Sequence, residues 1–363
     1  MIAAPEGRAD RLAEAVAAAG CEMALVGDLV RPGDSVRDAM ADVTWLTGYG
    51  GSSALTVVGA DVRAFVTDFR YVTTAEASVP DSFTVIDGTA DMLAAVAGLL
   101  AGRVAIDPAK TSLKSHGKLL DKVGEGVELV AVADLVTDLR RVKDGAEVEA
   151  IAAAAALTDE VYAWIEGRGL AGRSEREVAL AAEQRMRELG AEGPSFPAIV
   201  AAGANGALPH AVPGERAIDR GEYVVIDMGA IVDGYCSDCT RTLVDGDPDP
   251  AQREVYELVL AAQQAALAAI AAGADGRAVD AVARELISEG GYGEQFGHGL
   301  GHGVGIEVHE PPRLSMRSED TLLAGDVVTV EPGIYVPGAF GVRIEDLVLV
   351  TDAGHRNLSS RPK

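Results

Sequence analysis

The chain has 363 residues, of which 48% are hydrophobic, so it is long and apolar enough to form two domains with a sizeable core. Its formal net charge of −25 at pH 7 would repel phosphate backbones, which argues against a nucleic-acid-binding protein. Its three cysteines predict no disulfide framework, and no apolar run reaches the roughly 20 residues of a membrane span. Its start has no basic segment followed by an apolar core, so we expect no signal peptide and a cytoplasmic protein.

Residues 1–135 alternate between patterns typical of helices and patterns typical of strands. Residues 8–19 fit an amphipathic helix that Gly20 could end, and residues 91–100 fit a second helix. The expected strands are residues 23–27, 53–59, 63–67, 83–87 and 103–107. This alternation predicts a small α/β domain, and none of its residues indicates catalysis.

Residues 136–363 are expected to form a second domain, which residues 134–143 join to the first. Asp144 followed by Glu147 fits a capping box that opens a long helix. The expected helices of this domain are residues 144–167, 173–190, 252–272 and 276–289.

The second domain contains an internal repeat. Residues 221–229 and 325–333 align without a gap, and both run glycine, acid, an apolar-rich strand pattern, acid, one residue, glycine. Two expected helices precede each copy and a further strand follows it. Chance similarity of two strands is the alternative, but the shared position of the acid favours a duplication. We therefore expect two halves related by a pseudo-twofold axis, with the repeated acids near that axis.

The acids of these strands are predicted to converge in pairs. A turn at Asp233-Gly234 would place Asp227 opposite Thr240, with Asp238 on the same face at the roughly 7–8 Å Cα separation of diagonal neighbours. Glu331 and Glu345 are symmetric about Gly338, so a short loop there would pair them too. Because bare carboxylates on one face repel one another, a bound cation is the expected solution.

His298 and His302 supply imidazoles beside these acids. Their spacing of four would suit a zinc-binding helix, but the glycines around them argue against a helix. We therefore expect an extended, closely packed segment. These glycines are Gly297, Gly299, Gly301, Gly303 and Gly305.

Four carboxylates and one imidazole are too many ligands for one catalytic zinc ion. They suit two divalent ions that share bridging carboxylates, and the oxygen-rich set favours Mn²⁺, with Co²⁺ or Zn²⁺ as alternatives. Two such ions, roughly 3.5–4 Å apart, can activate a water and polarise a carbonyl. The predicted reaction class is metal-assisted hydrolysis.

These segments resemble the pita-bread metallopeptidases, the family of aminopeptidase P, prolidase and methionine aminopeptidase, with the metal-free creatinase as a relative. The resemblance covers nearly the whole chain and implies an α/β (α+β) protein with a creatinase-like N-terminal domain and a pita-bread C-terminal domain. The family's ordered ligand pattern of Asp, Asp, His, Glu, Glu is matched by Asp227, Asp238, His302, Glu331 and Glu345. By resemblance, Asp227 binds one ion, His302 and Glu331 bind the other, and Asp238 and Glu345 bridge them.

The resemblance also implies the residues that surround the substrate. His210, His298 and His309 match the three histidines that bind it, and Arg343 matches an arginine of the proline-specific branch. This arginine and the large N-terminal domain imply a Xaa-Pro aminopeptidase acting on proline-containing peptides, with a Xaa-Pro dipeptidase (prolidase) as the alternative. A homodimer is the family expectation. Further alternatives are a metal-free binding module and a creatinase-like hydrolase.

Several of these residues also have plainer interpretations. Arg343 could have no role beyond neutralising Glu345 or Asp346. Tyr335 could line the pocket or serve in ordinary core packing. Cys236 and Cys239 could form a redox pair, although two inert thiols are the preferred interpretation. His116 and His355 are expected at the surface, away from the cluster.

Overall fold

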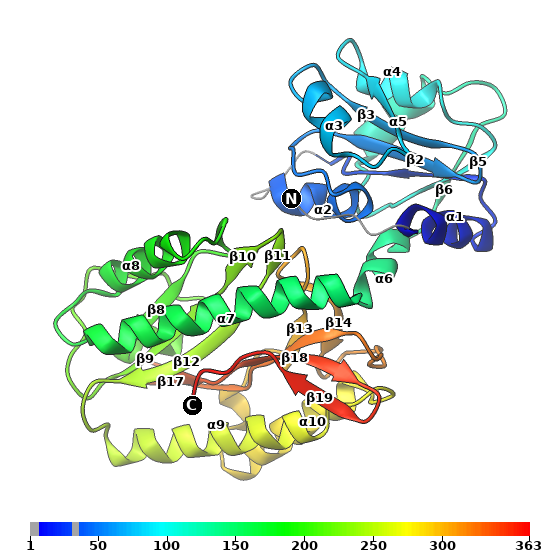
Figure 1. Cartoon of the computed structure of the whole chain (residues 1–363). Coiled ribbons are helices and arrows are strands. Elements are labelled where there is room, and N and C mark those ends of the chain that lie inside the picture. Colours follow the sequence, from blue (N-terminus) through cyan, green and yellow to red (C-terminus); the bar gives the residue numbers. More distant parts are fainter. Residues whose placement is uncertain (1–6, 31–35) are drawn as a thin grey trace. The chain divides into compact units, whose positions relative to one another are not determined.

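The computed structural model describes residues 7–30 and 36–363, and the chain forms two compact units, Met1–Arg140 and Arg141–Lys363 (Figure 1). Each unit combines helices with its own β-sheet structure, so the predicted α/β fold class is confirmed. No helix among the described residues is long and apolar enough to cross a membrane.

The first unit is built on a mixed six-stranded sheet in the order β4-β3-β2-β1-β5-β6. β2 pairs antiparallel with β1 and β3, whereas the other three neighbouring pairs are parallel. The strands are β1 Met23–Val26, β2 Leu55–Gly59, β3 Arg63–Thr67, β4 Thr84–Asp87, β5 Arg103–Ile106 and β6 Glu128–Ala131. The helices are α1 Arg8–Ala18, α2 Val36–Thr47, α3 Val72–Ser78, α4 Met92–Ala97, α5 Leu113–Leu120 and α6 Leu135–Arg141. Val57, Val66 and Val104 are fully buried in the core of this unit.

The five predicted strands and both predicted helices of this unit are present. The sequence patterns miss β6, α2, α3, α5 and α6, the last of which lies in the segment expected to join the two domains. The central residues of β6 are only half-buried, so its sequence carries little hydrophobic pattern. α3 and α5 span 7 and 8 residues, too few for a helical period to stand out.

The second unit contains the predicted helix–helix–strand order twice. The helices are α7 Gly145–Arg168, α8 Glu175–Glu188, α9 Pro250–Ala268 and α10 Gly276–Glu289, and the predicted capping box opens α7. Tyr162 of α7 and Ile226 of β9 belong to one buried cluster, and Ala262 of α9 and Val342 of β17 belong to another. The strands β9, β12 and β17 accordingly lie between α7 and α9 in Figure 1. Each copy of the repeat therefore buries its strands under its own pair of helices.

The strands of the second unit form four small sheets, in the orders β11-β10-β7, β12-β9-β8, β14-β13-β15-β18-β19 and β16-β17. The first-half strands are β7 Gly193–Pro194, β8 Ile199–Ala202, β9 Tyr223–Met228, β10 Ala230–Val232, β11 Tyr235–Cys236 and β12 Cys239–Val244, with the short helix η1 at Gly203–Ala207. The second-half strands are β13 Gly301–Gly303, β14 Glu310–Leu314, β15 Val327–Val330, β16 Gly333–Val336, β17 Phe340–Arg343, β18 Asp346–Thr351 and β19 Gly354–Asn357, with the short helix η2 at Gly293–Gln295.

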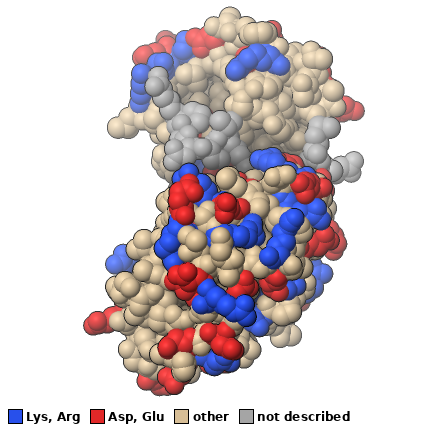
Figure 2. All heavy atoms as spheres, turned by 90° about the vertical axis from the view of Figure 1, so that its left-hand side faces the viewer, with Lys and Arg blue, Asp and Glu red and all other residues tan. Residues whose placement is uncertain are grey.

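The charged side chains on the face shown in Figure 2 are interspersed, acids beside bases, and form no single patch of one sign there. An interspersed pattern of this kind is the solvated surface expected of an acidic globular protein. Asp227, Asp238, Glu331 and Glu345, the acids of the predicted metal site, all belong to the second unit.

Candidate metal centre

The first hairpin brings Asp227 and Asp238 together. Its turn, Asp233-Gly234, has φ values of 46° and 75°, the positive pair that a two-residue turn of this kind requires. β9 pairs with β12 so that Asp227 lies opposite Thr240, which confirms the predicted register. Asp238 directly precedes β12, two residues from Thr240.

The second hairpin brings Glu331 and Glu345 to the same place from the other half of the unit. β15 pairs with β18, β16 pairs with β17, and both pairs share one register. Glu331 and Glu345 lie between these paired segments, at positions opposite each other in that register. The main-chain N–H of Glu345 donates to the Thr240 carbonyl at 3.1 Å. This hydrogen bond joins the two hairpins directly at the acids.

His302 lies on the short strand β13, so the predicted extended segment is confirmed and a helix is excluded there. The glycines on either side of it allow main chains to pack closely. A Cβ on Gly301 would lie 2.0 Å from the Thr329 carbonyl oxygen, and one on Gly303 would lie 2.1 Å from the Pro311 carbonyl oxygen. The Nδ1 atom of His302 lies 3.1 Å from the Gly303 carbonyl oxygen, which leaves Nε2 to face the acids.

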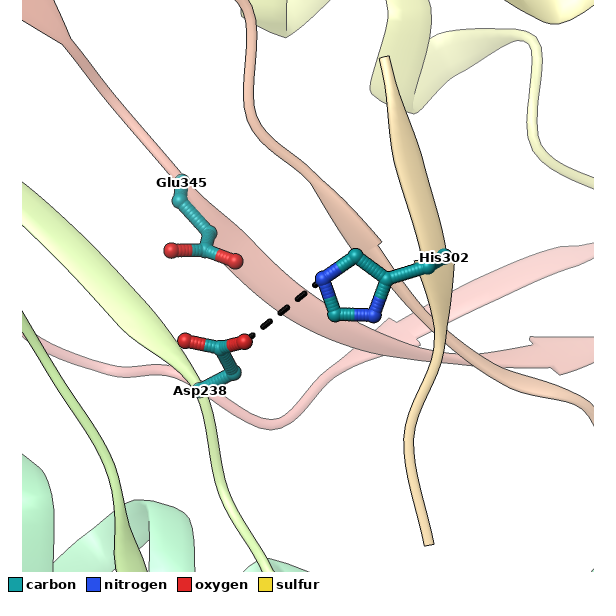
Figure 3. Close-up of side chains that lie close together, drawn as sticks. All are labelled: Asp238, His302 and Glu345. Carbon is teal, nitrogen blue, oxygen red and sulfur yellow. Dashed lines mark ion pairs between the residues drawn. The ribbon is translucent and has the colours of Figure 1, made fainter. Parts of the chain in front are cut away.

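Three side chains from three segments converge in the cluster shown in Figure 3. One ligand atom each from Asp238, His302 and Glu345 lies within 4.8 Å of the others, and all three residues are buried. His302 Nε2 is 3.6 Å from Asp238 Oδ2 and 3.2 Å from Glu331 Oε1. Asp227 enters the same site from β9 through its ion pair with Arg343, at 2.7 Å.

Neighbouring side chains hold one oxygen of several of these carboxylates. Arg343 donates to Asp227 Oδ2 at 2.7 Å, and Thr240 donates to Glu345 Oε2 at 2.8 Å. Thr329 donates to Glu331 Oε1 at 3.0 Å. These contacts fix the orientation of each carboxylate before any ligand binds.

Other carboxylate oxygens in the site have no such partner. Asp227 Oδ1, Asp238 Oδ1 and Glu345 Oε1 are buried and make no hydrogen bond with any described residue. A buried acceptor without a donor is costly, by about 1–3 kcal/mol. Hard divalent cations bind such oxygens, so the site fits divalent metal ions on its chemistry alone.

The acid–base properties of the cluster point the same way. Burial, and next the charge of Glu345, raise the pKa of Asp238 well above its ordinary value, while burial and the charge of Glu331 do the same for Glu345. Burial also raises the pKa of Asp227, and Arg343 only partly offsets it. Burial acts on Glu331 too, but the hydrogen bond and charge of His302 outweigh it and lower its pKa to about 2. Without a cation, the cluster would have to hold protons.

The cluster opens into a cavity of about 570 Å³, and eight of the nine predicted site residues line it. They are Asp227, Asp238, His302, Glu331, His210, His298, His309 and Arg343. Glu345 is not part of the cavity lining and lies buried against Asp238 and His302. The structure thus brings together all nine residues singled out in the sequence.

The three remaining histidines approach the cavity differently. His298 Nε2 lies 2.9 Å from the Tyr335 hydroxyl, and burial lowers the pKa of this histidine. His309 is an exposed residue whose ring stacks edge-on against His302 with centroids 4.4 Å apart, and partial burial of its imidazole together with His302 lowers its pKa to about 4. His210 is exposed in the loop after η1. A neutral imidazole at His309 can therefore donate a hydrogen bond into the cavity at neutral pH.

Arg343 belongs to the site by its contacts, although its pairing differs from the plainer interpretation. Its guanidinium pairs with Asp227, and it also donates to Thr240 Oγ1 and the Tyr335 hydroxyl at 3.0 and 2.8 Å. Asp346 is paired with Arg241 instead. Tyr335 lines the cavity and connects Arg343 to His298.

The sequence patterns miss several residues of the site. Thr240, which hydrogen-bonds Glu345 and Arg343, could have been found, because it shares a strand face with Asp238 two residues away. Arg313 and the apolar wall formed by Phe196, Pro197 and Ile199 carry no sequence signal of their own. They reach the cavity only through the pairing of distant strands.

The two cysteines beside Asp238 are buried, and neither forms a disulfide with a described residue. Cys236 Sγ contacts the Ile306 carbonyl at 3.4 Å, and Cys239 Sγ contacts the Glu345 carbonyl at 3.7 Å. Burial raises the pKa of Cys239 well above its ordinary value, which disfavours the reactive thiolate. His116 and His355 are half-buried and do not line the cavity.

Comparison with known proteins matches both units to families. Residues 149–352 match metallopeptidase family M24, and residues 8–142 match the creatinase/prolidase N-terminal domain. The chain is 48% identical over 233 residues to a Xaa-Pro dipeptidase of Pyrococcus furiosus, covering 64% of this chain and 67% of that one. Among solved structures, it resembles a Xaa-Pro dipeptidase from Bacillus anthracis (TM-score 0.90, 34% identity, 98% of this chain and 97% of that one). It also resembles an X-Pro aminopeptidase from Thermotoga maritima (TM-score 0.88, 34% identity, 98% of both chains). The chain therefore belongs to metallopeptidase family M24, and its first unit is a creatinase/prolidase N-terminal domain.

Proposed function

We propose that the chain is a Xaa-Pro peptidase, which hydrolyses the bond between an N-terminal residue and a following proline. One observation carries the proposal: buried oxygens of Asp227, Asp238 and Glu345 that have no hydrogen-bond partner among the described residues lie beside a cavity lined by four histidines. Two of the relatives are Xaa-Pro dipeptidases and a third is an X-Pro aminopeptidase, which supports a peptide substrate with proline in second position. Proline lacks the N–H that general peptidases recognise, so a dedicated enzyme is expected.

The metal ligands we propose are those that the family resemblance implies. Asp227 would hold one divalent ion, and His302 with Glu331 would hold the other. Asp238 and Glu345 would bridge the pair. Mn²⁺ is the ion that this oxygen-rich set favours. When bound, such ions supply Lewis acidity, which lowers the pKa of water and polarises a carbonyl.

The chain's own side chains would orient the substrate and stabilise charge. His309, neutral at pH 7, would donate a hydrogen bond to the developing oxyanion or to the leaving proline nitrogen. Arg343 would align Asp227 through its 2.7 Å ion pair and favour the ionised form of that carboxylate. The wall of Phe196, Pro197 and Ile199 would exclude water from the apolar side of the peptide.

A second candidate, a peptidase restricted to dipeptides, is favoured by Arg313. This exposed residue of β14 lines the cavity, and its guanidinium makes no hydrogen bond or ion pair with any described residue. A free guanidinium at the cavity wall can bind the carboxylate of a substrate that ends at proline. A longer peptide has no carboxylate at that point.

The test compares substrates of different length on protein stripped of metal and reloaded with Mn²⁺. We expect about two ions per chain and Mn²⁺-dependent cleavage of Xaa-Pro, but not Xaa-Ala, peptides. Absence of both metal and cleavage would contradict the proposal and favour a binding module. Arg313→Met should lower kcat/KM for a dipeptide by roughly 10- to 150-fold, because a hydrogen bond to a charged group contributes about 1.5–3 kcal/mol, and it should spare a tripeptide.

Arg317→Met is the matched control, because Arg317 is an exposed arginine nearby that does not line the cavity. Equal loss for both substrate lengths would contradict the carboxylate role of Arg313. A cytoplasmic homodimer also belongs to the proposal, and light scattering on the purified protein tests the oligomeric state.

A further inference from the structure

Residues 359–363, here called the 359–363 segment, are fastened to the second unit by many directed contacts. The Ser360 N–H and hydroxyl each donate to Asp159 Oδ2 at 2.7 Å, and the Arg361 N–H donates to Asp159 Oδ1 at 3.1 Å. The Arg361 side chain forms an ion pair with Glu166. Two acids of α7 thus bind one end of this short segment.

Arg241 links the segment to the main chain of a proposed metal ligand. Its buried guanidinium donates to the carbonyl oxygens of Arg361 at 2.7 Å and Pro362 at 3.2 Å. The same group donates to the Thr240 carbonyl at 3.0 Å and to the Glu345 carbonyl. Displacing the segment would remove two acceptors from Arg241 and loosen the group that holds Glu345.

Lys363 reaches the same point from another direction. Its ammonium lies 2.5 Å from Asp346 Oδ2 and donates to Gln263 Oε1 at 2.9 Å. The Asp346 carboxylate is fully buried, directly follows Glu345 in sequence, and is paired with Arg241 at 2.8 Å. Two cations, one of them from the segment, therefore clamp the residue next to Glu345.

We propose that the 359–363 segment is a positioning element of the metal centre. Through Asp346 and Arg241, Lys363 and the segment's carbonyls fix the main chain at Glu345. The Glu345 carboxylate then accepts from Thr240 through Oε2 and lies beside Asp238 and His302 (Figure 3). The inference rests on the proposed function of the site, because it assigns Lys363 an effect on metal binding. None of these five residues lines the substrate cavity, so they would act only through Glu345.

The experiment titrates Co²⁺ into the intact, metal-free 363-residue chain by calorimetry and records the visible spectrum of the Co²⁺ form. Lys363→Met should weaken Co²⁺ binding by roughly tenfold or more, as lost contacts behind a ligand do, and alter the spectrum. It should lower kcat for a Xaa-Pro dipeptide and leave KM near the wild-type value. Lys363→Arg should restore both properties, and Lys114→Met, a change at an exposed lysine of α5, should alter neither.

A second variant approaches the segment from its other end. Asp159→Asn weakens the anchor at Ser360 and Arg361 without touching Lys363 or Arg241, and it should shift Co²⁺ affinity in the same direction. It also carries the test if Lys363→Met fails to fold. Unchanged Co²⁺ affinity and spectrum in the folded variants, with only a lower melting temperature, would overturn the inference while leaving the metal site intact. A wild-type chain that binds no Co²⁺ would instead overturn the proposed function, and this inference with it.

Discussion

Replacing Thr240 by valine removes a single hydroxyl from the centre of the metal site. The side chain is fully buried, its Oγ1 donates to Glu345 Oε2 at 2.8 Å, and it accepts from Arg343 Nε at 3.0 Å. Valine has a similar shape, so the change deletes two hydrogen bonds without opening a cavity. Each buried group left without a partner costs about 1–3 kcal/mol, so the two groups together should make the metal-free variant less stable by about 2–6 kcal/mol.

The same change should also weaken metal binding. Loss of a contact behind a ligand reduces metal affinity roughly 10- to 100-fold. Tenfold weaker binding removes about 1.4 kcal/mol of the stabilisation that saturating metal provides. Denaturant unfolding with and without a fixed, saturating Mn²⁺ concentration measures both effects, since the first appears without metal and the second as a smaller metal-dependent gain.

Thr242→Val is the matched control on the same strand. Thr242 is buried, and among the described residues its hydroxyl hydrogen-bonds the main chain of Arg343 alone, at 2.9 and 3.1 Å. We expect a comparable loss of stability without metal and a metal-dependent gain like that of the wild type. If Thr240→Val keeps the full gain and normal turnover, its hydroxyl does not support a metal ligand and the reasoning is refuted.

Three further predictions concern other parts of the molecule. Losing a contact behind a metal ligand costs up to roughly 100-fold in activity, so losing a ligand itself through Glu345→Ala should reduce hydrolysis by more than that. The circular dichroism spectrum should stay native, and near-normal turnover would refute the bridging role of Glu345. His309→Ala should retain both metals in elemental analysis but lose about 10²- to 10⁴-fold in turnover, whereas loss of metal would show that His309 is a ligand. Asp42 is buried beside Arg140 and Lys110, and although burial opposes it, these two cations lower its pKa below the ordinary 3.8. Asp42→Asn should therefore destabilise the first unit by about 3 kcal/mol or more, undiminished between pH 7 and 5. The difference should shrink only below pH 3.8, as the wild-type carboxyl becomes protonated, and a difference that faded already near pH 6 would contradict the assignment.

The sequence predicts the two hairpins that carry the four acids well, because the residues that determine their turns and strand registers are close together in the chain. A two-residue turn at Asp233-Gly234 sets the register, and the period of two in a strand then puts Asp238 and Thr240 on one face. The duplicated pattern adds the second pair of acids by symmetry of position. The glycines around His302 were informative for a related reason, since they exclude a helix and require close main-chain packing.

Contacts between distant segments could not be predicted in the same way. Arg343 lies two residues from Glu345 in sequence, yet its ion pair is with Asp227 on another sheet. Arg313 reaches the cavity from β14, whose register with β13 shifts after His302. Such pairings depend on how whole sheets pack against each other, and no residue spacing records that.

The duplication explains why the two halves of the site are similar but not equivalent. Asp227 and Glu331 occupy the same position in the two copies of the repeat, and each approaches the site from a strand that precedes a hairpin. The surroundings differ: Asp227 has the permanent cation Arg343 at 2.7 Å, whereas Glu331 has the imidazole of His302 at 3.2 Å. Arginine cannot bind a metal, but a neutral histidine can. Beside Asp227, the first half therefore offers oxygen ligands, while beside Glu331 the second half also offers a nitrogen. Two ions held by this site would occupy chemically different positions even though the strands beneath them are copies of one another.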